Sequence, residues 1–152
     1  MKHRIWLVFA IILVLGITAF FVVRSAEDKV TNRMLSQAER FAIPANWKLT
    51  TEIVRPERFM CISTNPCPSL SRRWDTGKEL TDNDVTALTS RLGFPMTTDH
   101  PCKRQANVIG TDTICISTGT DGEFDYWLTV RSPGPGEPQL VGLNIRPHYV
   151  PD

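Results

Sequence analysis

The chain has 152 residues, of which 41% are apolar and 9% aromatic, with 17 Lys and Arg against 16 Asp and Glu. This length allows one compact domain with an appendage and excludes two full domains. A net charge of +1 argues against nucleic-acid binding through a bulk basic surface, and the apolar and aromatic content argues against a wholly disordered chain.

Residues 5–23 form an uncharged apolar run. A helix of 19 residues is about 28 Å long at about 1.5 Å per residue, close to the roughly 30 Å hydrocarbon core of a bilayer. Lys2, His3 and Arg4 precede the run, and positive charge there predicts that residues 1–4 stay in the cytoplasm. The sequence therefore predicts a single-pass signal-anchor helix over residues 5–23 in the lipid bilayer of the plasma membrane, with the rest of the chain extracytoplasmic.

A cleaved signal peptide is the alternative interpretation, and it requires small residues at the −3 and −1 positions of a cleavage site. The triplet 17–19 lies inside the apolar run, and the triplet 24–26 places Arg24 at −3, so we favour an uncleaved anchor. With only residues 1–4 in the cytoplasm, no cytosolic enzyme or DNA-binding unit fits there. We therefore assign function to residues 25–152, in which 14 Lys and Arg face 16 Asp and Glu.

All four cysteines follow the apolar run, at Cys61, Cys67, Cys102 and Cys115. An even number of cysteines in an exported domain of this size predicts two disulfides. Zinc is the alternative, but the spacings differ from the usual Cys-x2–4-Cys pattern. Three pairings are possible. We favour the local one, Cys61–Cys67 with Cys102–Cys115, over Cys61–Cys115 with Cys67–Cys102, which would join the two halves of the domain.

Residues 24–43 are predicted to form a juxtamembrane helix or stalk that ends before Pro44. Its apolar positions recur at spacings of four, four and three and are expected to pack in the core: Val30, Met34, Ala38 and Phe41. Residues 44–147 are predicted to form the extracytoplasmic domain, and residues 148–152 a loose tail.

Within residues 44–147, alternation predicts a strand over 47–54, with Trp47, Leu49, Thr51 and Ile53 on one face. Further strands are expected at 59–63 and 69–75, then a helix opened by Thr81 and Asp84 as a capping box. A hairpin of 106–109 with 113–117, a strand over 124–130, a loop over 133–138 and a last strand over 141–145 complete the domain. The order predicts an α+β fold: an N-terminal transmembrane helix, then a small disulfide-stapled domain with an antiparallel sheet and one or two helices.

The search for chemistry yields no catalytic residue, cofactor site or metal site. Asp75-Thr76-Gly77 matches the core of an aspartic-protease loop, but that chemistry needs a second carboxylate copy, and a polar turn explains the tripeptide. Asp121, Glu123 and Asp125 alternate as calcium ligands can, and we interpret them as a solvated acidic strand face. The three histidines, His3, His100 and His148, are scattered.

Four residues are candidates for an interaction surface. Arg72 and Arg73 form a basic pair near Arg55 and Arg58, and such a pair suits an anionic polymer or an acidic partner. Trp74 and Trp127 are, like Trp47, aromatic side chains able to line a ligand groove, although aromatic residues more often lie in the core.

The stretch from Cys61 to Trp74, with Cys-Pro-Ser at 67–69 and Arg-Arg-Trp at 72–74, resembles a pattern in small actinobacterial membrane-anchored proteins. That resemblance implies one amino-terminal span and a Cys-containing extracytoplasmic domain, and it implies no activity. We expect a non-enzymatic, membrane-tethered binding or interaction module with an unknown envelope or membrane-protein partner, and no nucleic acid. An envelope hydrolase with a non-contiguous active site and an accessory subunit of a larger membrane complex are the alternatives.

Overall fold

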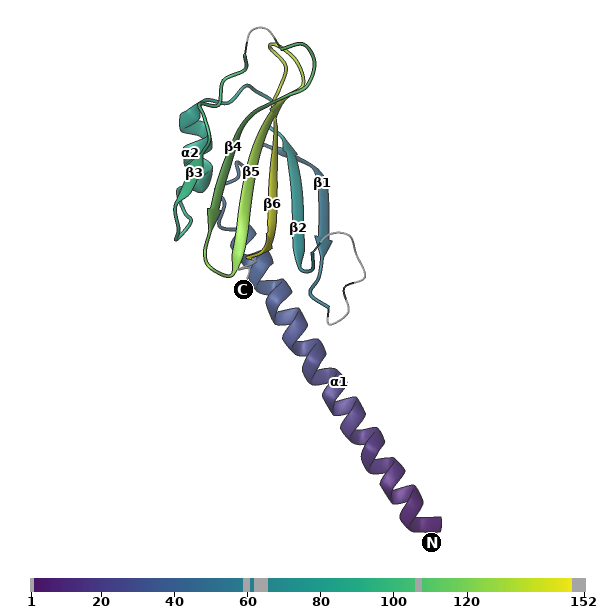
Figure 1. Ribbon diagram of the computed structural model, residues 1–152. Helices are drawn as coiled ribbons and strands as arrows, with labels where there is room; N and C mark the ends of the chain where they lie inside the picture. Colours follow the sequence, from purple (N-terminus) through teal and green to yellow (C-terminus); the bar gives the residue numbers. More distant parts are fainter. Residues whose placement is uncertain (1, 59–60, 62–65, 106–107, 149–152) are drawn as a thin grey trace.

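The chain forms one long helix that leads into a single sheet-based domain (Figure 1). The computed structural model describes residues 2–58, 61, 66–105 and 108–148. The long helix, α1, runs over Lys2–Ala38, and its part from Ala10 to Ala38 contains a long apolar stretch that is not buried in the domain. By length and composition α1 is therefore able to cross a membrane. Within this part of α1 the Thr18 hydroxyl donates to the Val14 carbonyl at 2.8 Å, so a polar group in the apolar run is already satisfied.

The last turns of α1 belong to the domain. Met34, Ala38 and Phe41 are buried in the core and Val30 packs partly against it, which confirms the predicted apolar stripe. The helix ends at Ala38, earlier than residue 43, because the chain then turns toward the second helix, where the Ala42 N–H donates to the Leu88 carbonyl at 2.8 Å.

Further contacts fix the stalk to the domain. The Glu57 N–H donates to the Thr31 hydroxyl at 2.9 Å, and Arg33 pairs with Glu123 at 2.7 Å. Arg58 lies 3.6 Å from Glu27 and 3.7 Å from Asp28. Residues from several successive turns of α1, between Glu27 and Arg33, thus contact the rest of the domain.

The domain is built on one antiparallel sheet of six strands in the order β1-β2-β6-β5-β4-β3. Its elements are β1 (Lys48–Arg55), β2 (Ser69–Asp75), α2 (Asp82–Thr89), β3 (Met96–Thr98), β4 (Asp112–Thr120), β5 (Phe124–Ser132) and β6 (Leu140–Pro147). Together with α1 and two disulfides this confirms the predicted α+β class.

The core lies on one face of the sheet only. Along β5 and β6 the side chains alternate between fully buried and partly exposed, as expected for a sheet with one covered face. The buried set of these two strands, together with Val85 and Leu88 of α2 and the end of α1, fills the space: Phe124, Tyr126, Leu128, Val130, Val141, Leu143 and Ile145. The Tyr126 hydroxyl, the polar end of a fully buried ring, donates to Asp121 at 2.6 Å. Burial and this contact raise the pKa of Tyr126.

Several predicted elements need correction. The predicted hairpin of 106–109 with 113–117 is wrong. Residues 108–109 are not in a strand, and residues 106–107 lie outside the described part of the chain. β4 pairs instead with β5 and with the short strand β3, which the sequence did not predict. Of the strand expected at 59–63, Cys61 is described and is not in a strand; the other positions lie outside the described residues.

Other local predictions are confirmed. Thr81 and Asp84 form the capping box of α2. The disulfides are the local ones, Cys61–Cys67 and Cys102–Cys115.

His148, expected in the loose tail, is instead held by two contacts. Its N–H donates to the Glu123 carbonyl at 2.8 Å, and its ring Nδ1 lies 2.6 Å from Asp125.

Candidate functional site

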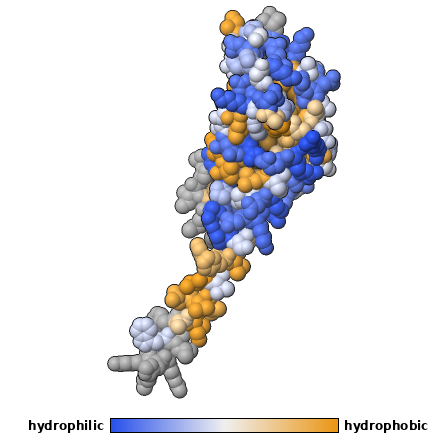
Figure 2. Space-filling view, turned by 180° about the vertical axis from the view of Figure 1, so that it is seen from behind, coloured by the Kyte–Doolittle hydropathy of each residue, from blue (hydrophilic) through white to orange (hydrophobic). Residues whose placement is uncertain are grey.

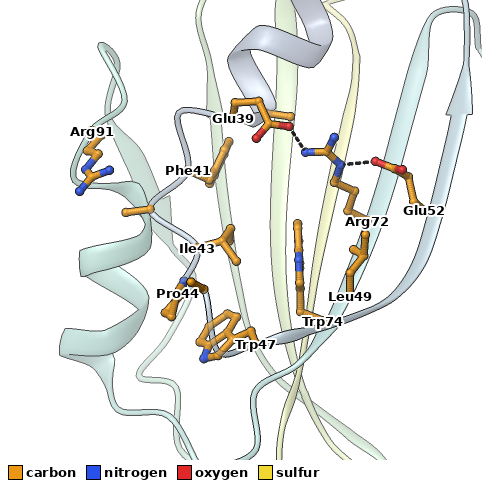
Figure 3. A pocket seen from close by; sticks show the side chains of 13 residues that line it. Glu39, Phe41, Ile43, Pro44, Trp47, Leu49, Glu52, Arg72, Trp74 and Arg91 are labelled. Atoms are coloured by element: carbon orange, nitrogen blue, oxygen red, sulfur yellow. Dashed lines mark hydrogen bonds and ion pairs between the residues drawn. The ribbon is translucent and has the colours of Figure 1, made fainter.

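An open groove of about 760 Å³ lies between the end of α1, the segment that follows it, and strands β1 and β2. Figure 3 shows its walls: Trp74 projects from β2, Leu49 flanks it from β1, and Phe41, Ile43 and Trp47 face it from the connecting segment. Seen from outside, the mostly hydrophilic domain carries apolar patches midway along its length, above the apolar rod of α1 (Figure 2). The groove therefore combines largely buried aromatic residues with an accessible surface that is mostly polar, to which Glu39, Glu52, Arg72 and Arg91 contribute.

The connecting segment forms this wall because it is pinned at both ends. The Ala42 N–H donates to the Leu88 carbonyl at 2.8 Å, and the Trp47 N–H donates to the Pro44 carbonyl at 3.1 Å. The two tryptophans are largely buried, at 8% exposure for Trp47 and 7% for Trp74, so they form the floor. Leu49 is 45% exposed and forms the accessible rim.

Arg72 forms the polar end of the groove. Its Nη1 donates to Glu39 and its Nε donates to Glu52, each at 2.6 Å (Figure 3). Burial lowers the pKa of the Arg72 guanidinium, but the hydrogen bonds to Glu39 and Glu52 outweigh it, so the net effect is a raised pKa. Arg72 is therefore a permanent cation between two carboxylates from different elements.

Glu52 reaches the groove because of an irregularity in β1. The pairing of β1 with β2 shifts between Leu49 and Thr51, so that Leu49 pairs with Trp74 and Glu52 pairs with Arg72. The predicted alternation, which placed Leu49 and Ile53 on one face, is therefore wrong. One extra residue reverses the facing of everything beyond it, so Ile53 lies on the opposite face of the sheet from Leu49.

The four predicted interaction residues separate into two pairs. Arg72 and Trp74 are two residues apart on β2 and both line the groove. Arg73 lies between them, so its side chain is on the other face, where it is exposed. Trp127 is also on that face, with the guanidinium carbon of Arg146 5.4 Å from its ring centroid, an arrangement typical of cation–π contact.

Sequence reasoning missed several groove residues, among them Glu39 and Arg91. Glu39 was expected inside a continuing helix, and its role depends on where α1 ends. Arg91, which follows α2, lines the groove from a segment 19 residues away from Arg72. Only tertiary packing brings these two residues to the groove, although period-two alternation does separate Arg72 from Arg73.

The other sequence candidates have local partners. The Asp75 carboxylate accepts from the Gly77 N–H at 2.9 Å, and Gly77 has φ +68°, so the tripeptide is a polar turn after β2. Of the acidic residues near β5, Glu123 pairs with Arg33 and Asp125 with His148. Within the described ranges no group of three His, Cys, Asp or Glu residues is arranged to hold a metal ion.

The histidine contacts are also local. His100 Nδ1 lies 2.9 Å from the carboxylate of Asp99, its neighbour in the chain. Across residues 10–58, 66–105 and 108–148, no hydrogen bond joins the ring of His100 or His148 to a Ser, Thr or Cys side chain.

Comparison with known proteins adds no relative: no family model, no curated protein and no solved structure matches this chain. The geometry of the groove is therefore the guide to its chemistry. The apolar part of this lining, Leu49 with the two tryptophans, suits non-covalent contact with an apolar group, because burial of apolar surface is the main favourable term that it supplies.

Proposed function

We propose that this chain is a membrane-tethered binding module, with α1 as an uncleaved anchor in the plasma membrane and the sheet domain outside the cell. The groove of about 760 Å³ carries the proposal. Both disulfides lie in the domain that follows the apolar helix, which supports an oxidising compartment. The positive residues before the apolar run support a cytoplasmic amino terminus.

The lining of the groove favours an apolar or aromatic part of a partner as its occupant. Arg72 is already paired with two carboxylates, so an additional anion gains little from it. Leu49, at the rim, is 45% exposed, and covering its apolar side chain with a partner would stabilise the complex.

The height of the groove narrows the kind of partner. Ala38, beside the groove, is fifteen residues beyond Val23, the end of the uncharged run, which corresponds to about 22 Å along the helix. A lipid tail in the bilayer does not reach that far. We therefore propose that the occupant belongs to an envelope component or to the outer part of a membrane protein.

A matched pair of variants on β1 tests the proposal. Leu49→Glu places a charge on the groove rim, while Ile53→Glu places the same charge on the opposite face of the same strand, where Ile53 is 43% exposed. With a fluorescent apolar probe and the full chain in nanodiscs, we expect Leu49→Glu to weaken probe binding and Ile53→Glu to leave it unchanged. Equal binding by both variants would contradict a ligand role for the groove.

The same two positions allow a test in native membranes. A photocrosslinking amino acid at position 49 is expected to give a discrete adduct, and the same amino acid at position 53 is expected to give none. The adduct is expected to disappear when the probe that fills the groove is added in excess. An adduct at 49 that persists under that competition would count against the groove as the binding site.

A further inference from the structure

The face of the sheet opposite the groove holds a second, smaller hollow. Strand alternation places Ser71 and Arg73 of β2, Gly142 and Asn144 of β6, and Thr129 and Arg131 of β5 on this face. These six residues, together with Arg72 and Leu140, line a hollow of about 170 Å³. At about 30 Å³ per water molecule, the hollow of about 170 Å³ has the volume of roughly six waters, so it accommodates one compact polar group.

Gly142 creates the hollow. In the register of the sheet it lies between Arg73 on one side and Thr129 on the other. A Cβ atom at this position meets only the carbonyl oxygens of Arg72 at 3.9 Å and Thr129 at 4.0 Å, which are ordinary contacts. The absence of a side chain at Gly142 therefore leaves free space above the middle of the sheet rather than relieving a clash.

The charge around the hollow is positive and unpaired. Arg73 and Arg131 are exposed, and neither guanidinium makes a hydrogen bond or ion pair with any residue in the described part of the chain. The carboxylates on the same face are engaged elsewhere: Asp75 accepts from the Gly77 N–H, and Asp125 contacts His148. Residues 25–152 have two more acidic than basic residues, so a hollow flanked by two arginines is positive against an acidic background.

The donors around the hollow favour one kind of ligand. Two guanidinium groups are joined by the hydroxyls of Ser71 and Thr129 and by the amide of Asn144. Guanidinium binds carboxylate and phosphate in two-pronged fashion, and this set supplies more donors than the two oxygens of one carboxylate accept. We propose that the hollow around Gly142 is a binding site for a phosphate group carried on a larger ligand of the envelope.

This site lies on the opposite face of the sheet from the groove, and Arg72 borders both hollows. Ile53, Arg73 and Gly142 share the open face, whereas Leu49, Arg72 and Trp74 share the covered one. A ligand with a phosphate group therefore binds here whether or not a partner occupies the groove, and loss of one site does not predict loss of the other.

The test is a titration of the full chain, in nanodiscs of uncharged lipid at low salt, with inorganic phosphate. We expect saturable shifts of the Gly142 backbone and Asn144 side-chain amide NMR signals. Arg73→Gln and Arg131→Gln are each expected to weaken binding by about tenfold, the effect of losing one charge-assisted contact. Gly142→Val, which the backbone contacts allow, is expected to abolish binding by filling the hollow while the remaining amide signals keep their positions.

Lys29→Gln is the matched control, because it removes one exposed positive charge from the stalk, far from the hollow. Unchanged phosphate binding by Lys29→Gln supports a built site. An equal loss in Lys29→Gln would show that net charge alone is responsible and would overturn the proposal. An equal response to acetate would overturn the assignment to phosphate, and so would the absence of saturable shifts.

Discussion

Arg72 of β2 donates a hydrogen bond to Glu39, the first residue after α1, with 2.6 Å between Nη1 and Oε1. This contact joins the sheet to the point where the long helix ends. A second bond of the same guanidinium, to Glu52, continues the link to the edge strand β1. One side chain thus connects three elements that border the groove.

Arg72→Leu is expected to lower the free energy of unfolding of the domain by about 1–2 kcal/mol, because two charge-assisted hydrogen bonds are lost while the freed carboxylates remain accessible to water. Arg73→Leu, the adjacent substitution on the open face, is expected to change it by no more than about 0.5 kcal/mol. Urea unfolding of the full chain in mild detergent measures both values. Similar losses in the two variants would contradict a structural role for the Arg72 pairs.

The cap of α2 predicts a dependence of stability on pH. Lys78 and Thr81 donate to the Asp84 carboxylate and lower its pKa from 3.8 to about 2. A carboxyl group whose pKa is lower in the folded than in the unfolded chain stabilises the fold above the unfolded value, and this contribution is lost as pH falls through the folded value. Asp84→Ala is therefore expected to lower stability by about 1 kcal/mol at neutral pH.

The difference between the parent chain and Asp84→Ala is expected to shrink as pH falls from 3.8 toward about 2. Thr86→Ala, an exposed substitution in the same helix, is the control, and its difference from the parent should not vary with pH. A constant difference for Asp84→Ala across this range would show that the carboxylate is not held in its charged form by the cap.

The local disulfide pairing predicts a distinctive tryptic map without reduction. Residues 59–72 contain Cys61 and Cys67 and no internal cleavage site, so they are expected as one peptide lighter by two hydrogens. Residues 92–103 are expected to be linked to residues 105–131 through Cys102 and Cys115. Attachment of peptide 59–72 to either of the other two would disprove the local pairing.

The proposed topology predicts that protease added to intact spheroplasts removes most of the chain. The sheet domain follows α1, so cleavage in its exposed loops is expected to leave a small fragment that contains the apolar run. The control is the same treatment of inverted vesicles, in which the domain is expected to be protected. Survival of the intact domain in spheroplasts would reverse the proposed orientation.

The parts of the fold that could be predicted are those set by local pattern. The stripe of Val30, Met34, Ala38 and Phe41 and the capping box at Thr81 depend on residues only a few positions apart. The strand at 124–130 follows from a regular alternation that the structure keeps. Periodicity is reliable in these places because one face of each element is buried.

The rest depends on contacts between distant segments. The three residues of β3 carry too little pattern of their own and form a strand because β4 offers an edge. The groove could be predicted only in part. Alternation along β2 brings Arg72 and Trp74 to one face. The irregularity in β1 after Leu49 determines which face Glu52 is on, and the end of α1 determines where Glu39 lies. Neither the irregularity in β1 nor the end of α1 could be predicted from the residues of its own segment.

Because one unbroken helix runs from the apolar run to Ala38, the number of residues between the two determines how the domain is rotated about the helix axis. One alanine inserted between Arg24 and Ser25, below the first stalk contacts at Glu27, would turn the whole domain by about 100° about the helix axis and raise it by about 1.5 Å. Binding of a diffusible ligand to the groove would not change with that rotation. A partner anchored beside the protein in the same bilayer would lose its alignment, and a set of one to four inserted alanines would show recovery near a full turn.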